Sequence, residues 1–163
     1  NPSPSGFFND PNSPMTSSPQ EMQRYLSKIS GPLLDRIDIH IEVTPVPFEK
    51  LSEERKGEGS VEIRKRVTAS REIQSERFKD FENVHYNAQM SVKQIRKFCK
   101  LSPESLTLLK TAMEKLNLSA RAYDRILKVS RTIADLANVT DISPDHIAEA
   151  IQYRSLDREG WLG

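Results

Sequence analysis

The chain has 163 residues, of which 36% are hydrophobic and 29% are charged, and its formal net charge is +1. This composition is typical of a soluble, helix-rich globular protein and argues against an intrinsically disordered chain. The near-zero charge excludes a global basic field, so any contact with nucleic acid needs a local patch or repeated subunits. No apolar run approaches the roughly 20 residues that cross a bilayer, and we expect no membrane association.

The first 51 residues are predicted to contain a loop, a helix and a strand. Residues 1–17 are rich in proline and serine, which favours irregular structure. Ser18 and Pro19 predict a helix start, and this helix is expected to run to about Ile29. Apolar and polar residues then alternate without a break over 37–43, which predicts a strand.

A polar, glycine-containing segment at 52–59 is predicted to link two domains. Ser60 is expected to cap a long helix that runs to about Phe81. One broad apolar stripe of this helix is predicted to face the core, and it comprises Ile63, Val67, Ile73, Phe78 and Phe81. The other faces are dense in Arg, Lys and Glu, which favours exposure to solvent.

Four further helices are predicted after it. Ser91 followed by Gln94 is a capping-box pattern for a short helix. Ser102-Pro103 and Ser143-Pro144 each place a capping serine before a proline that suits the first helical turn. Residues 119–137 form the remaining helix, whose apolar residues recur at core spacing.

These elements predict a mainly α chain in two parts. Residues 1–51 are expected to end an α/β core with one clear strand. Residues 60–158 are expected to form an all-α bundle, followed by a tail at 159–163. Because one strand cannot form a sheet, its partner strands are expected from missing segments or from a second copy.

Two arginine-containing segments are candidates for phosphate chemistry. Arg36 directly precedes the predicted strand, where a fixed guanidinium can stabilise the charge that develops during phosphoryl transfer. Arg121 and Arg125 lie four residues apart on one helix face, and Arg121 falls in the first turn, where the helix N-terminus favours anions. Spacing alone nevertheless favours ordinary surface charge, with Arg36 paired to Asp35 or Asp38.

Other catalytic arrangements are absent from the sequence. It has no Gly-x-x-x-x-Gly-Lys-[Ser/Thr] loop to cradle a triphosphate and no acidic pair after an apolar strand to hold Mg²⁺. Asp38, His40 and Glu42 alternate along the predicted strand, and we expect them on its solvent face rather than around a metal. The single cysteine, Cys99, excludes an internal disulfide and is predicted to be a buried structural thiol. The chain alone is not expected to hydrolyse ATP.

Several runs of residues resemble one known family. The run Ser30-Gly31-Pro32-Leu33-Leu34-Asp35-Arg36-Ile37-Asp38 is similar to the segment that follows sensor 1 in magnesium-chelatase-like AAA+ ATPases of the ComM/YifB type. Further similar runs are Arg71–Gln74, Leu118–Ala122, Arg125–Lys128, Arg131–Leu136 and Glu149–Arg154. The resemblance spans nearly the whole chain in order, so we expect the C-terminal portion of such an ATPase.

The resemblance implies roles that spacing could not assign. Asn1 resembles the sensor 1 residue, which orients the water near the γ-phosphate. Arg36 resembles the arginine finger, which acts on ATP bound by the neighbouring subunit. Arg121 resembles sensor 2, which reaches the phosphates from a helical lid, and Arg125 is a weaker supporting candidate. Residues 60–158 would form that lid.

The opening loop departs from the family pattern. Many relatives have two Cys-x-Cys pairs there, a plausible zinc-type cluster. This chain has Ser3, Ser5, Met15 and Ser17 at the matching positions. Serine and methionine would not hold Zn²⁺ there, so no structural metal is predicted.

The family implies a hexameric, cytoplasmic ATPase that uses ATP and Mg²⁺ to remodel DNA, as a helicase or branch-migration motor in recombination or natural transformation. No cofactor is expected in this chain alone. Two alternatives stay open. One is the ATPase subunit of a magnesium-porphyrin chelatase, and the other is a helical nucleic-acid-binding module over 60–158.

Overall fold

A computed structural model describes residues 20, 24, 28, 30–41, 43 and 57–154. The elements in chain order are α2 (Gly31–Leu34), α4 (Ser60–Phe78), the 3-10 helix η1 (Asn87–Gln89), α5 (Val92–Phe98), α6 (Pro103–Lys115), α7 (Ala120–Leu136) and α8 (Pro144–Gln152). The described chain is therefore mostly helical, as predicted. None of its helices combines the length and the apolar character that crossing a bilayer requires.

Serine caps begin four of these helices. The capping residues are Ser91, Ser102, Ser119 and Ser143, and each side chain accepts a hydrogen bond from the N–H three residues later. Such a bond satisfies an amide that the first turn leaves unpaired, and it is worth about 0.5–2 kcal/mol. The predicted cap of α4 was wrong, because Ser60 is itself helical and Gly59 precedes it without a side-chain cap.

Two asparagines with left-handed backbone end α6 and α7. Asn117 has a φ of 48° and Asn138 a φ of 56°. Asparagine tolerates this conformation better than most residues, and it commonly terminates a helix. After Asn138 the N–H of Val139 turns back and donates to the carbonyl of Ala134 at 3.0 Å. This turn starts the loop that leads from α7 to α8.

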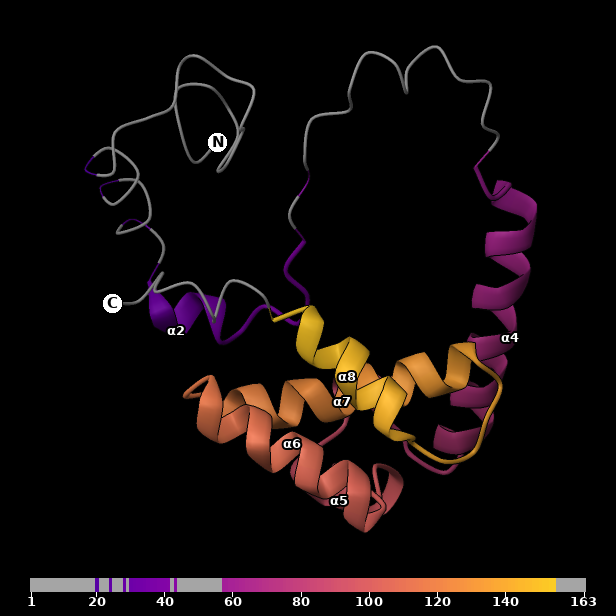
Figure 1. Ribbon diagram of the computed structural model, residues 1–163. Coiled ribbons are helices and arrows are strands. Elements are labelled where there is room, and N and C mark those ends of the chain that lie inside the picture. Colours follow the sequence, from indigo (N-terminus) through magenta and orange to yellow (C-terminus); the bar gives the residue numbers. More distant parts are fainter. Residues whose placement is uncertain are drawn as a thin grey trace.

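Helix α7 lies in the centre of the bundle and packs against α4, α5, α8 and η1 (Figure 1). Helices α4, α6, α7 and α8 each give a fully buried side chain to a common core, namely Phe78, Leu109, Ile126 and Ile147, all at most 2% exposed. The rings of Phe78, Phe81 and Phe98 meet edge to face, with centroids 5.6–6.2 Å apart. Edge-to-face packing adds roughly 0.5–1.5 kcal/mol per pair beyond the burial of apolar surface.

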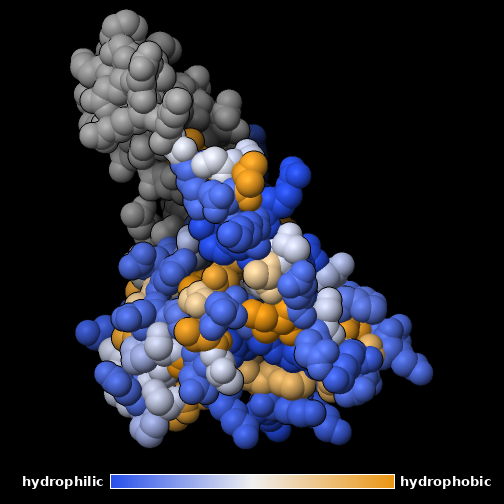
Figure 2. All heavy atoms as spheres, turned by 90° about the vertical axis from the view of Figure 1, so that its right-hand side faces the viewer, coloured by the Kyte–Doolittle hydropathy of each residue, from blue (hydrophilic) through white to orange (hydrophobic). Residues whose placement is uncertain are grey.

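The first half of α4 extends beyond the bundle (Figure 1). Residues 60–69 are all exposed, and they include Ile63 at 41% and Val67 at 44%. The predicted apolar stripe was therefore wrong for this half, and only the part of α4 from Ser70 onward packs on the core. Figure 2 shows mostly hydrophilic side chains with a few apolar ones around this projecting half, and more apolar side chains below it, over the bundle.

The segment 30–41 lies against the C-terminal end of α8. The N–H of His40 donates to the carbonyl of Tyr153 at 2.8 Å. The guanidinium of Arg154 is fully buried and donates to the carbonyl of Ile37. Leu34, at the end of α2, is buried at 3% exposure.

The predicted strand over 37–43 is not present, because residues 37–41 and 43 take no strand conformation in the described chain. A strand needs neighbouring strands for its hydrogen bonds, and His40 instead donates its N–H to the end of α8. His40 is also buried, at 5% exposure, rather than on a solvent face. Glu42, most of the predicted helix at 18–29 and residues 52–56 of the predicted linker lie outside the described residues.

Candidate functional site

Arg36 lies two residues after α2 and is exposed. Its N–H donates to the carbonyl of Leu33 at 3.0 Å, and its Nη1 donates to the carbonyl of Pro32 at 2.5 Å. No carboxylate among the described residues pairs with it. The two adjacent acids face other arginines, since Asp38 pairs with Arg125 and an Asp35 oxygen lies 3.9 Å from Arg154 Nη2. The surface pairing that spacing favoured for Arg36 is therefore not formed.

Arg121 lies in the first turn of α7, two residues after the capping Ser119. The side chain is exposed, whereas the neighbouring Ala122 is fully buried and anchors the turn in the core. Within the described part of the chain, no hydrogen bond or ion pair holds the guanidinium. An arginine at a helix N-terminus, next to unpaired amides, has the chemistry to bind a phosphate group.

Arg125 lies one turn after Arg121 and is held by the segment that carries Arg36. Its Nη1 lies 2.7 Å from Asp38 Oδ1, an ion pair without the geometry of a hydrogen bond. The two side chains are 30% and 38% exposed, so solvent screens this pair. Burial and then the positive charge of Arg125 lower the pKa of the nearby Lys128, whose Nζ donates to the Ala88 carbonyl at 2.8 Å.

This ion pair joins two candidate segments. Asp38 comes two residues after Arg36, and Arg125 comes one helical turn after Arg121. The structure thus attaches the Arg36 segment to the helix that carries Arg121. Asn1 and the opening loop lie outside the described residues, as do the positions predicted not to bind zinc. Within the described residues no cluster of His, Cys, Asp or Glu could hold a metal ion.

A buried polar network connects α4, η1 and α7. Asp135 is fully buried and accepts two hydrogen bonds from Arg77, at 2.6 and 2.5 Å, and one from Arg131 at 3.1 Å. Asn87 donates to the same carboxylate at 2.8 Å. Arg131 also donates to the carbonyls of Val139 and Thr140, at 2.8 and 2.6 Å, in the loop that Asn138 begins. Two guanidinium groups therefore share one carboxylate.

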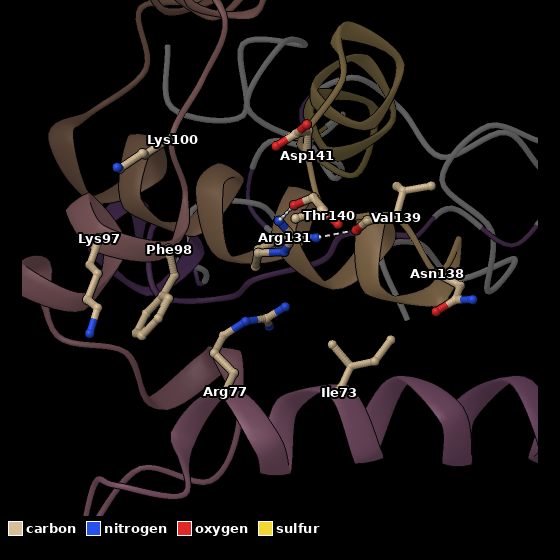
Figure 3. A pocket seen from close by; sticks show the side chains of 10 residues that line it. All are labelled: Ile73, Arg77, Lys97, Phe98, Lys100, Arg131, Asn138, Val139, Thr140 and Asp141. Atoms are coloured by element: carbon tan, nitrogen blue, oxygen red, sulfur yellow. Dashed lines mark hydrogen bonds between the residues drawn. The ribbon is translucent and has the colours of Figure 1, made fainter.

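A cavity of about 410 Å³ opens beside this network (Figure 3). Its walls come from α4, from α5 and the residues that follow it, and from α7 and the loop after it, and four of its lining side chains are basic: Arg77, Lys97, Lys100 and Arg131. Sequence reasoning missed this basic wall. A signal was present, since residues 83–103 contain four Lys or Arg and no Asp or Glu, but a short charge run does not show which helices it faces.

Two family models match the chain. The model described as magnesium chelatase, subunit ChlI C-terminal, matches residues 57–154, and the model described as magnesium chelatase, subunit ChlI, matches residues 1–51. The first match covers more than half of the chain and all of the helical bundle.

Individual relatives agree with these matches. The chain is 44% identical to the competence protein ComM of Haemophilus influenzae and 40% identical to the protein YifB of Escherichia coli, over 159 residues in each case. It is 34% identical to the protein Rv2897c of Mycobacterium tuberculosis over 132 residues, or 81% of this chain. Although 97% of the chain aligns with ComM and YifB, it spans only 30% of their length. The chain belongs to the magnesium-chelatase-like family that includes ComM and YifB.

Proposed function

We propose that this chain is the C-terminal part of an ATP-driven motor that acts on DNA in recombination or natural transformation. The 44% identical relative is a competence protein, which supports DNA uptake or processing as the setting. In this proposal the complete protein is a hexameric AAA+ ATPase that uses ATP and Mg²⁺. Helicase or branch-migration activity would belong to the complete ring, since this chain contains no phosphate-binding loop.

The observation that carries the proposal is the pair of exposed arginines, Arg36 and Arg121. Neither has a carboxylate partner among the described residues, and their segments are joined by the Asp38–Arg125 ion pair. A guanidinium that is always charged and has free donors can stabilise the negative charge of phosphoryl transfer. We assign Arg36 as the finger for the neighbouring subunit, Arg121 as sensor 2 and Asn1 as sensor 1.

The segment 37–43 is proposed to complete a sheet in the longer protein. Its apolar side chains are exposed here, with Ile39 at 44%, Ile41 at 71% and Val43 at 77%. Alternating apolar residues without a cover are typical of a strand whose neighbours are supplied elsewhere. The relatives are about three times as long as this chain, so their remaining length is sufficient for such a core.

The test measures ATP hydrolysis by the complete protein, with and without branched DNA. We expect Arg36→Ala to lower the rate at least about 1000-fold, as loss of an arginine finger does in related chemistry. Arg121→Ala is expected to raise the KM for ATP and to lower the rate. Lys110→Ala is the control, because this exposed lysine makes only a 3.9 Å contact with Glu114 on α6. Wild-type hydrolysis by both arginine variants in assembled rings would refute the proposal.

A mixing experiment separates a finger from a residue that acts in its own subunit. Rings that combine Arg36→Ala subunits with subunits disabled in the phosphate-binding loop should regain activity. Each active interface then takes its intact Arg36 from one subunit and its bound ATP from the next. If mixed rings stay inactive while both subunits assemble, Arg36 does not act across an interface.

A second candidate is the ATPase subunit of a magnesium chelatase, which the descriptions of both family models favour. The same arginines would serve ATP hydrolysis there. The discriminating measurement is stimulation of the complete protein by branched DNA compared with stimulation by a porphyrin and Mg²⁺. Stimulation by the porphyrin alone would favour the chelatase.

A further inference from the structure

The surface around α5 carries a local excess of positive charge. Four basic side chains occur within eight residues: Lys93, Arg96, Lys97 and Lys100. All four are exposed, and no carboxylate among the described residues forms an ion pair with any of them. Several other basic side chains pair with acids, as in the pairs Arg66–Glu58 and Lys79–Glu76. Although the net charge of the chain is only +1, these four side chains form a concentrated basic surface, which we call the α5 surface.

Two cavities flank α5 and share Lys97. The cavity of about 410 Å³ lies on the side of α4 and α7 (Figure 3). The other, of about 580 Å³, is lined by Phe81, Ser91, Lys93, Gln94 and Arg96 in addition to Lys97. Basic groups thus line both of the cavities beside one short helix.

The side chains that line the first cavity also carry a net positive charge. Arg77 and Arg131 share only Asp135, which leaves one positive charge in the network behind the cavity. The wall contains one acid, Asp141, and two lysines, Lys97 and Lys100. The cavity and the network behind it therefore keep a net positive charge, which favours an anion.

Aromatic rings lie among these basic groups. Lys97 Nζ lies 5.0 Å from the ring centroid of Phe98 and 5.6 Å from that of Phe81, so both rings attract the ammonium. Phe98 faces the first cavity and Phe81 lines the second. Both rings are half-buried, and cations beside aromatic rings are a common arrangement on surfaces that track a polynucleotide backbone.

We propose that the α5 surface binds the phosphodiester backbone of a nucleic acid, with no preference for sequence. Lysines act as point charges toward successive phosphates, and contacts to phosphates carry no sequence information. A free nucleotide fits less well, because the basic groups extend across both cavities. This inference does not depend on the motor function, since binding of a backbone needs no ATP.

The first cavity lies away from Arg121, the α7 arginine proposed to contact ATP. Arg121 and Arg131 are ten residues apart on α7, which corresponds to about 15 Å along the helix. The α5 surface would therefore be able to hold a nucleic acid at the first cavity while Arg121 contacts a nucleotide.

The test uses the 163-residue chain and fluorescently labelled oligonucleotides, both single-stranded and duplex. The variant Lys93→Gln, Lys97→Gln, Lys100→Gln removes three positive charges from the α5 surface. We expect its affinity at about 50 mM salt to fall at least tenfold, and the slope of log K against log salt to fall by about 2–3. The matched control Lys65→Gln, Lys110→Gln, Lys115→Gln removes the same charge from exposed positions on α4 and α6.

Three results would overturn the inference. The first is no binding of either oligonucleotide by the wild-type chain, and the second is an equal loss of affinity in both triple variants. The third is equally tight binding of polyglutamate, which would indicate an acidic protein segment as the ligand. Circular dichroism of both variants excludes misfolding as the cause of lost binding. None of these measurements depends on ATP hydrolysis. A negative result would therefore leave the motor proposal unaffected.

Discussion

The two ends of α7 place arginines in opposite surroundings. Near the N-terminal end, Arg121 is exposed and has no side-chain partner within the described chain. About three turns later, Arg131 is 4% exposed and donates hydrogen bonds to Asp135, Val139 and Thr140. The same residue type therefore serves the fold at one end of the helix and is available to a ligand at the other.

This difference separates stability from function. A buried guanidinium whose carboxylate is removed keeps an uncompensated charge, which destabilises a protein strongly. An exposed arginine without a partner contributes little to folding, so its removal should act on ligand binding alone. Variants along α7 can therefore test whether the helix is divided in this way.

The largest effect is expected for Asp135→Ala. It leaves Arg77 and Arg131, whose side chains are 13% and 4% exposed, without their shared carboxylate. We expect the free energy of unfolding to fall by about 3–5 kcal/mol. Urea denaturation of the 163-residue chain, followed by circular dichroism, measures it.

The control for this prediction is Arg121→Ala on the same helix. Its free energy of unfolding should stay within about 0.5 kcal/mol of the wild type. If Asp135→Ala lowered the free energy of unfolding by less than about 1 kcal/mol, the buried polar network would not be needed for stability. The division of α7 into a structural end and a ligand-binding end would then be wrong.

A smaller effect is expected from Cys99, which lies near the Arg131 end of α7. Burial raises the pKa of its thiol to about 11 from an ordinary value of 9.0, although the charges of Arg131 and Arg77 act in the opposite direction. In the unfolded chain the thiol ionises from about pH 9.0, whereas in the folded chain it stays neutral up to about pH 11. This contribution to stability is therefore complete below pH 9.0 and is lost as the pH rises through that window.

Urea denaturation at several pH values tests this sign. Between pH 9.0 and 11 the free energy of unfolding of the wild type should fall by up to about 2–3 kcal/mol more than that of Cys99→Ala. We compare the slopes of the free energy of unfolding against pH, because the lysines and tyrosines that both proteins share then contribute equally to both slopes. Equal slopes for the two proteins would show that Cys99 is not held neutral by burial.

The contrast along α7 also explains which features the sequence could predict. Helix starts are local, because a serine and the residues just after it contain the whole capping pattern. The starts at Ser91, Ser102 and Ser143 were therefore predictable and are confirmed. The pairing of Arg77 with Asp135 joins residues 58 apart, and no local pattern encodes it.

Two predictions were wrong for the same reason, because a local pattern does not show which distant part of the protein a surface meets. The apolar residues Ile63 and Val67 have core-like spacing, but the described structure leaves them without a neighbouring surface. The alternation over 37–43 is strand-like, but a strand forms only beside another strand. In both places the apolar residues predict a surface that packs against another segment. The chain spans only 30% of the length of ComM, so the rest of a longer protein could supply that segment.

The smallest effect is expected for the ion pair that joins the Arg36 segment to α7. Asp38 and Arg125 are 38% and 30% exposed, and their 2.7 Å contact lacks hydrogen-bond geometry, so solvent and salt weaken it. A double-mutant cycle of Asp38→Asn and Arg125→Ala should give a coupling below about 1 kcal/mol, and less at high salt. A coupling above about 2 kcal/mol would instead make Arg125 a structural residue like Arg131. A small value leaves Arg125 able to exchange Asp38 for a phosphate oxygen, so this measurement decides to which end of α7 Arg125 belongs.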